Sequence, residues 1–185
     1  MIRKRQNMKK LGIKEIVYVG VFAAIIAALS QVSFPLPSGV PVTLQTLAIA
    51  LTGALLGWKL GLCAVVVYII LGCVGVPVFA GFVGGAQVMV GMTGGFIWGF
   101  LIMVALCGIG AVMKNKILGY GLGMLGLIAC HLLGVLQFMA VAKMGFGESF
   151  LLVSVPYLIK DVVSVVLGYI FGGLIRGRLI KANLL

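Results

Sequence analysis

The chain has 185 residues, of which 63% are hydrophobic and only 9% are charged, and its formal net charge is +11. A soluble domain is usually about 45–50% apolar and about 25% charged, so too little polar surface exists here to cover a water-soluble globule. The composition excludes an ordinary soluble protein and predicts a single integral membrane domain over residues 1–185.

Apolar runs broken by proline, glycine or lysine predict six membrane-spanning helices and an all-α fold. The expected spans, in chain order, are 13–32, 45–57, 60–76, 87–113, 117–142 and 155–175. The basic segment before the first span imitates a signal peptide, but the apolar run continues into a proline-rich loop, so we expect an uncleaved helix. The second and third spans are short and joined by GWKLG, so they need tilt or support from neighbouring helices.

The basic residues lie at the ends of these spans. All fourteen lysines and arginines except Lys143 and Lys160 fall on one side of the expected bundle. The positive-inside rule therefore places both termini in the cytoplasm and accounts for the net charge without a nucleic-acid partner. All five prolines fall toward the outer side, as do the two longest irregular stretches, SFPLPSGVPVTLQ (33–45) and GVPVFAGFVGGAQ (75–87). Such loops are candidates for the rim and lid of a binding site, or else are simple connectors.

The side chains offer little for catalysis. The chain has one histidine, His131, and three carboxylates, of which Glu15 and Glu148 are expected at opposite ends of the bundle. No GxxxxGK[ST], HExxH or Gly-x-Ser-x-Gly sequence occurs, which argues against ATP hydrolysis by this chain and against an enzyme. The four cysteines lack CxxC spacing, and we interpret them as small buried thiols without a metal. We therefore expect neither a metal nor a cofactor.

Asp161 is the only carboxylate expected within a span, which makes it the main candidate for binding a ligand. Neighbouring residues on a helix point about 100° apart, so we expect Lys160 and Asp161 to have separate partners, while Lys160 and Ser164 share a face. The alternative is that Lys160 reaches the outer headgroups and Asp161 caps a loose first turn. His131, near the middle of its helix, is interpreted as a packing residue.

Other polar groups are expected in the same outer half of the bundle. These further candidates are Thr43, Gln45, Thr46, Gln87, Thr93 and Gln137. Phe96 and Trp98 are candidates for an apolar wall. A mainly apolar pocket with a few fixed polar groups suits a compact ligand with N–H donors and an anionic tail, where Asp161 accepts and Lys160 attracts the anion.

Small residues four apart recur along the spans and permit close helix contact. The pairs are Gly53/Gly57, Gly91/Gly95, Gly119/Gly123 and Gly168/Gly172, with Ala23/Ala27 and Ala24/Ala28 in the first span. Most of these pairs are expected to serve internal packing. One alanine face is a candidate docking surface for another membrane protein.

The segment QVSFPLPSGVPVTLQTLAIALTGALLGWKLG (31–61) resembles the signature region of the BioY family, the biotin-binding S components of energy-coupling factor (ECF) vitamin transporters. The resemblance continues through LGCVGVPVFAGFVGGAQVMVGMTGGFIWGF (71–100), HLLGVLQFM (131–139) and PYLIKDVVSVV (156–166). It implies a six-helix S-component bundle in a prokaryotic cell membrane. It also implies an outer biotin site, capped by the loops after the first and third helices, that functions in vitamin uptake.

The resemblance also implies residue roles and partners. The family's acidic residue that binds the biotin rings falls on Asp161, and the loop block adds Gly84 and Gly85 to the candidate ligand-binding residues. Partners are a transmembrane T component and two ATPase subunits, which alone use ATP. The small-residue patch that contacts the T component corresponds to four alanines: Ala23, Ala24, Ala27 and Ala28.

One departure from the family pattern concerns the cation near the site. Many members carry lysine three residues after the aspartate, where this chain has Ser164, and we hypothesise that Lys160 replaces it. Two alternatives to a biotin S component stay open. One is an S component for another small vitamin or a biotin precursor, and the other is a ligand-free structural membrane subunit.

Overall fold

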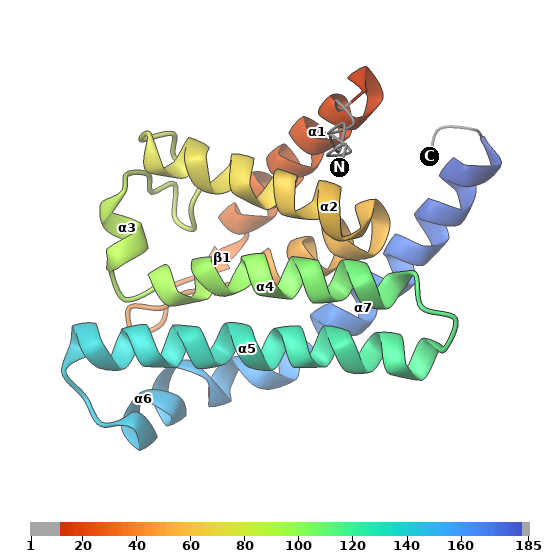
Figure 1. Ribbon diagram of the computed structural model, residues 1–185. Helices are drawn as coiled ribbons and strands as arrows, with labels where there is room; N and C mark the ends of the chain where they lie inside the picture. The colour runs from red at the N-terminus through yellow and green to blue at the C-terminus, as the bar shows by residue number, and fades with distance from the viewer. Residues whose placement is uncertain (1–11, 183–185) are drawn as a thin grey trace, which may run out of the picture.

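The computed structural model describes residues 12–182, which are mainly helical (Figure 1). The long helices are α1 (Ile13–Gln31), α2 (Gln45–Cys73), α4 (Gly94–Ala111), α5 (Lys116–Ala142) and α7 (Val155–Lys181). Between them lie the short helices α3 (Gln87–Val90) and α6 (Phe146–Val153) and the antiparallel strands β1 (Ser33–Phe34) and β2 (Val42–Thr43). Within this part of the chain, five helices are long and apolar enough to cross a membrane. The basic segment 3–10 lies outside the described residues.

Helix α2 contains two arms that fold back on each other at Gly57. The backbone there is non-helical, with φ 77° and ψ 175°, a conformation that favours glycine. The Gln45 amide donates to the Tyr68 hydroxyl at 2.8 Å, although a straight helix would separate these residues by about 34 Å. The two arms correspond to the two short spans expected around GWKLG. Because they form one element, α2, the described part of the chain has five long helices where the sequence predicted six spans.

Two further boundaries differ from the prediction. The expected span 87–113 is interrupted after α3, and α4 begins only at Gly94. The Gln137 side chain of α5 donates to the carbonyl oxygens of Met89 and Gly91, at 2.9 and 2.8 Å, and so occupies backbone groups at the interruption. The segment 143–154, expected as a loop, contains α6.

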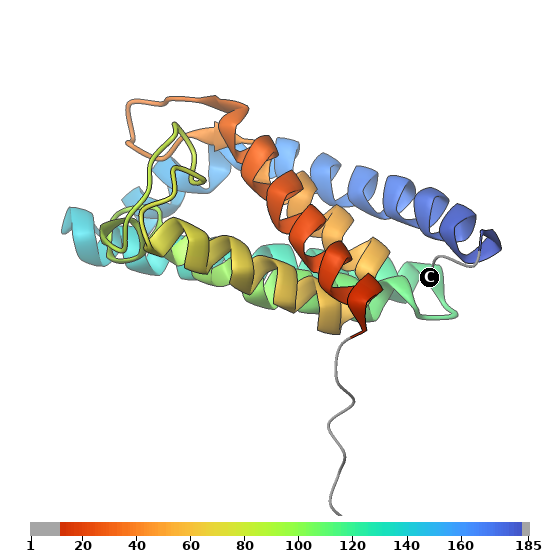
Figure 2. The same cartoon turned by 90° about the horizontal axis from the view of Figure 1, so that it is seen from above.

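The irregular segments gather at one end of the bundle, away from the C-terminal end of α7 (Figure 2). The β1–β2 hairpin carries Pro35, Pro37 and Pro41, and the α2–α3 connection is closed by a bridge between Phe79 and Val83. The Gln31 amide donates to the carbonyls of Val78 and Phe79, at 3.1 and 3.2 Å, and so ties this connection to α1. The expectation that both long loops lie on the same face is therefore confirmed.

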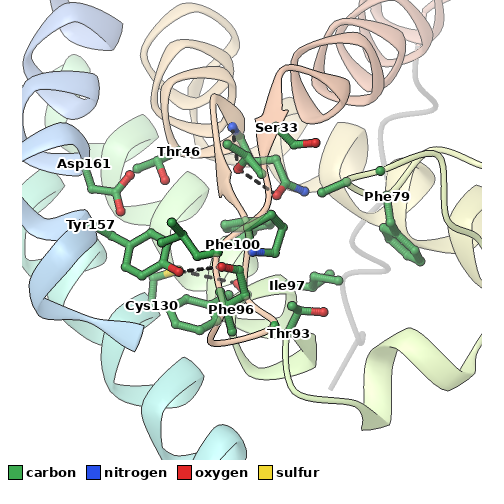
Figure 3. Close-up of a pocket in the computed structure, with 18 of the residues that line it drawn as sticks. Ser33, Thr46, Phe79, Thr93, Phe96, Ile97, Phe100, Cys130, Tyr157 and Asp161 are labelled. Carbon is green, nitrogen blue, oxygen red and sulfur yellow. Dashed lines mark hydrogen bonds between the residues drawn. The ribbon is translucent and has the colours of Figure 1, made fainter. Parts of the chain in front are cut away.

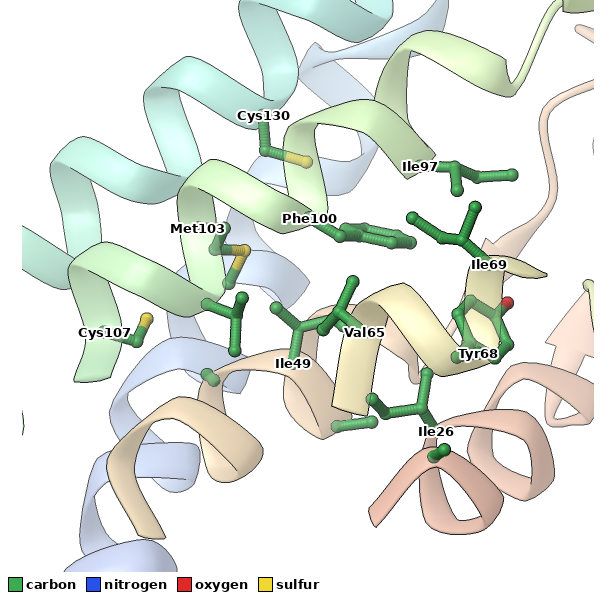
Figure 4. Packing of buried hydrophobic residues seen from close by; sticks show 14 of the residues in the cluster. Ile26, Ile49, Val65, Tyr68, Ile69, Ile97, Phe100, Met103, Cys107 and Cys130 are labelled. Carbon is green, nitrogen blue, oxygen red and sulfur yellow. The ribbon is translucent and has the colours of Figure 1, made fainter. Parts of the chain in front are cut away.

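A hydrophobic core fills the junction of α1, α2, α4 and α5 (Figure 4). Phe100 extends from α4 over Val65 and Ile69 of α2, and Ile26 of α1 is fully buried in the same cluster. Burial of an aromatic or branched side chain contributes roughly 1.5–3 kcal/mol, so this junction fixes how the four helices meet.

Glycines allow these helices to approach so closely that their backbones are in contact. A Cβ atom at Gly53 would lie 2.6 Å from the Val104 carbonyl oxygen, and one at Gly108 would lie 2.3 Å from the Trp58 nitrogen. On the other side of α2, Gly168 and Gly172 of α7 contact its alanines in the same manner. The expected role of the glycine pairs in internal packing is confirmed at these positions.

Replacing Gly53 by alanine is expected to lower the free energy of unfolding by about 1–3 kcal/mol, because the methyl group overpacks the contact with α4. The matched control is Gly121→Ala on α5, where nothing lies within 4 Å of the added Cβ and stability should stay constant or rise slightly. Thermal unfolding of both variants in detergent measures the difference. Equal unfolding temperatures would contradict the close approach.

Candidate ligand-binding site

A cavity of about 470 Å³ lies beneath the irregular segments, enclosed by α2, α4, α5, α7 and the two loops. Its wall is mainly apolar and includes Phe79, Phe96, Ile97, Phe100 and Leu127. Figure 3 shows Asp161 and Tyr157 at one side of this cavity and Phe79 at the other. The volume and the few polar groups are those of a small-molecule site.

Phe96 lines the cavity as expected, but Trp98 does not. The Trp98 side chain is exposed on the other face of α4, and its indole N–H donates to the Met89 carbonyl at 3.3 Å. The two residues are two positions apart on a helix, so their side chains point in different directions and only one of them can line the cavity.

Asp161 is the buried charge of the site, with an exposed fraction of 4%. Its Oδ2 atom lies 3.2 Å from Nε2 of His131, its Oδ1 atom forms an ion pair with the Lys160 ammonium, and the Thr46 hydroxyl also interacts with it. A buried carboxylate is tolerated when it is paired and hydrogen-bonded, and here α2, α5 and α7 supply the partners.

The expectation that Lys160 and Asp161 have separate partners was wrong. The 100° angle describes the Cβ directions, but four flexible methylene groups let the ammonium curl back to the neighbouring carboxylate. Lys160 also donates to the Thr43 carbonyl at 2.7 Å. It therefore joins α7 to β2.

His131 belongs to the site, although the sequence indicated only a packing role. Its Nδ1 atom lies 2.9 Å from the Ser154 hydroxyl, while Nε2 faces Asp161. A neutral imidazole with its proton on Nε2 satisfies both contacts, because the serine then donates to Nδ1. The signal was present in the chain: His131 is its only histidine and lies within an apolar span.

The loop over the cavity is fastened to α7 by a second residue. The Tyr157 hydroxyl donates to the Val40 carbonyl and lies 3.3 Å from the Ser38 hydroxyl. Tyr157 was not predicted from the sequence, since a tyrosine near a span end is also typical of a membrane interface. Together with the Lys160–Thr43 contact, it holds segment 38–43 against the start of α7.

Four of the nine predicted ligand-binding residues line the cavity: Thr43, Gln45, Lys160 and Asp161. Gln45 is engaged within the protein, since it accepts from the Thr43 hydroxyl at 3.0 Å and donates to Tyr68. Thr46 and Thr93, singled out as polar groups of the outer half, also line the cavity.

The other five predicted residues lie outside the cavity lining. They are Ser164, Gly84, Gly85, Gln87 and Gln137. Ser164 is buried on α7, and Gln137 holds the α3–α4 break. The Gln87 amide donates to the Gly84 carbonyl at 2.8 Å, and Gly85 adopts φ +108°, so these residues shape the loop before α3.

The predicted docking alanines divide between two faces of α1. Ala23 is buried and Ala27 packs against the core, whereas Ala24 and Ala28 are exposed. All four cysteines are free, but only Cys107 and Cys130 are buried as expected, whereas Cys63 and Cys73 are partly exposed. Among residues 12–182, no group of histidine, cysteine and acidic side chains could hold a metal.

Comparisons with known proteins agree on one family. A model described as "BioY family" matches residues 4–181. The "Probable biotin transporter BioY" of Pyrococcus horikoshii is 35% identical over 166 residues, which cover 89% of this chain and 98% of that protein. The "Biotin transporter BioY" of Thermotoga maritima is 41% identical over 123 residues, which cover 66% of this chain and 72% of that protein.

A solved structure shares the fold. It is the crystal structure of the S component for biotin from an ECF-type ABC transporter, and the TM-score is 0.81. The match covers 96% of this chain and 95% of that one at 23% sequence identity. The S-component fold expected from the sequence is thereby confirmed.

Replacing His131 by phenylalanine is expected to lower the free energy of unfolding by about 1.5–3 kcal/mol, the usual contribution of a hydrogen bond to a charged group. In an Asp161→Asn background the same replacement should cost less, and thermal unfolding in detergent gives this double-mutant cycle. Leu132→Phe, at an exposed neighbour, is the control. Equal losses in both backgrounds would show that His131 does not act through Asp161.

Proposed function

The chain belongs to the BioY family of prokaryotic multi-pass membrane proteins, and we propose that it is the biotin-binding S component of an ECF-type uptake transporter. The observation that carries this proposal is the cavity of about 470 Å³ with a single buried carboxylate at one side. Biotin combines a cyclic urea, a thioether ring and a carboxylate tail, so it needs a few polar groups in a largely apolar pocket.

Asp161 accepts hydrogen bonds from the urea N–H groups of biotin. An ionised carboxylate is the strongest such acceptor that a side chain offers. Thr43, Gln45 and Lys160 are further polar residues of the cavity lining, beside Thr46 and Thr93. Residues outside the lining act indirectly: Gly84, Gly85, Gln87 and Gln137 shape the loops. Ser164 is buried on α7, three residues after Asp161.

In the membrane, each arm of α2 counts as a span, which gives six helices with both termini in the cytoplasm. The distribution of charge supports this orientation, since Lys114 lies in the α4–α5 connection and Lys116 begins α5, at the end opposite the loop-covered cavity. Biotin is therefore captured from the outer face, where the two loops cover the cavity.

Delivery across the cell membrane needs a T component and two ATPase subunits. Transport, not catalysis, is the function, because the relatives are named as transporters. This chain lacks a nucleotide-binding loop, so partner subunits use the ATP, and the chain needs no cofactor of its own. The exposed Ala24 and Ala28 on α1 form the surface that contacts the T component.

Two other functions are less well supported. A ligand-free structural subunit has no need of a cavity with a paired, buried carboxylate, since burying a charge is unfavourable. An S component for another small vitamin, or for a biotin precursor, fits the cavity volume but not the names of the relatives.

Asp161→Asn is expected to raise the Kd for biotin at least about tenfold, because a charge-assisted hydrogen bond is lost. Binding of labelled biotin to purified protein in detergent measures this, with thiamin and riboflavin as competitors. Glu148→Gln, at an exposed carboxylate of α6, is the matched control and should bind normally. Tight binding of thiamin or riboflavin but not biotin would contradict the proposed substrate.

Ala24→Leu should prevent co-purification with the T component and ATPases while biotin affinity stays constant, because leucine keeps the helices apart. The control is Ala140→Leu on the exposed face of α5. Retention of the partners by the Ala24 variant would move the docking surface elsewhere.

A further inference from the structure

The two charged groups of the cavity stand together at one place. Of the described residues that line it, only Lys160 and Asp161 carry a charged side chain, and they form an ion pair with each other. His131 is satisfied as a neutral ring by Ser154 and Asp161. The site therefore presents a neutralised donor–acceptor pair and not a free cation.

The opposite side of the cavity contains only uncharged groups. Phe79 lies there, across the cavity from Asp161 in Figure 3, and Ile97 and Thr93 lie toward the same side. Thr93 adds a hydroxyl group to the lining of this region. A hydroxyl binds a carboxylate, an amide or an ester, because it both donates and accepts hydrogen bonds.

The Lys160 ammonium is held beside Asp161, where the urea ring of biotin is proposed to bind. Two of its three N–H donors point to Asp161 and to the Thr43 carbonyl, which leaves one for a ligand. A donor beside an acceptor matches the neighbouring C=O and N–H groups of one cyclic urea. The biotin carboxylate is carried away from that ring by its alkyl chain, so it cannot reach Lys160 while the urea occupies Asp161.

Moving the ammonium to the tail would be unfavourable. It would leave the buried Asp161 carboxylate without its cation, and breaking a buried pair in this manner is strongly destabilising. The hypothesis that Lys160 supplies a cation for the carboxylate tail is thus disfavoured by its contacts.

Given the proposed function, in which Asp161 binds the urea, we propose that this chain also accepts biotin derivatives whose tail carries no charge. Lys160 and Asp161 bind the urea together, and the tail is held by shape and neutral hydrogen bonds. The ligand class is a bicyclic urea with an unbranched chain, whether this chain ends in a carboxylate, a carboxamide or a methyl ester.

Competition against labelled biotin tests this on the purified protein in detergent. The Kd of biotinamide and of biotin methyl ester should lie within about threefold of that of biotin, which is well short of the roughly tenfold change that the loss of an ion pair would cause. Diaminobiotin, which keeps the tail but lacks the urea carbonyl, should bind at least about tenfold more weakly, since it cannot accept from Lys160. If the protein binds biotin but biotinamide does not compete, the inference is wrong.

A lysine variant adds a second measurement. Lys160→Met should weaken biotin and biotinamide by the same factor, while Lys143→Met, at an exposed position outside the cavity, changes neither. A loss confined to biotin would show that Lys160 binds the carboxylate. If wild-type protein binds no biotin analogue at all, the proposed function fails, which is distinct from a preference for the charged tail.

Discussion

The structure depends on one buried carboxylate and on the partners that make its burial possible. Asp161 of α7 is paired with Lys160 from its own helix and with His131 from α5, and Thr46 of α2 also interacts with it. Ionised groups are tolerated in apolar surroundings only when such partners are in place. The carboxylate therefore couples the positions of three helices, and the network that lines the candidate ligand site is also part of the fold.

The same network extends to the loops that cover the cavity. Lys160 binds the Thr43 carbonyl and Tyr157 binds the Val40 carbonyl, so α7 holds the first loop through its backbone. Gln31 holds the second loop through the carbonyls of Val78 and Phe79. Irregular backbone at membrane depth is stable only when it is covered or lines a cavity, and these side chains satisfy its polar groups.

Much of the fold and part of the site could be predicted from the sequence. Asp161 was predicted because a carboxylate in an apolar span is rare, and the loops were predicted because proline and glycine concentrate in them. His131 was missed because the pattern of a single helix does not say which helices are neighbours, and His131 acquires its role only beside Ser154 and Asp161. The count of long helices differed because the reversal at Gly57 leaves two arms within one element.

The Lys160–Asp161 pair illustrates what helix geometry alone cannot predict. Successive Cβ atoms diverge, but a lysine side chain is long enough to return to its neighbour, and the low dielectric of the site strengthens the attraction. An internal counter-ion also means that the cavity does not contain a lone charge at membrane depth. Because the pair is neutral in total, a ligand enters a site whose polarity is local and directional. With the carboxylate already neutralised by the residue beside it, the pair offers hydrogen-bond directions and no net charge.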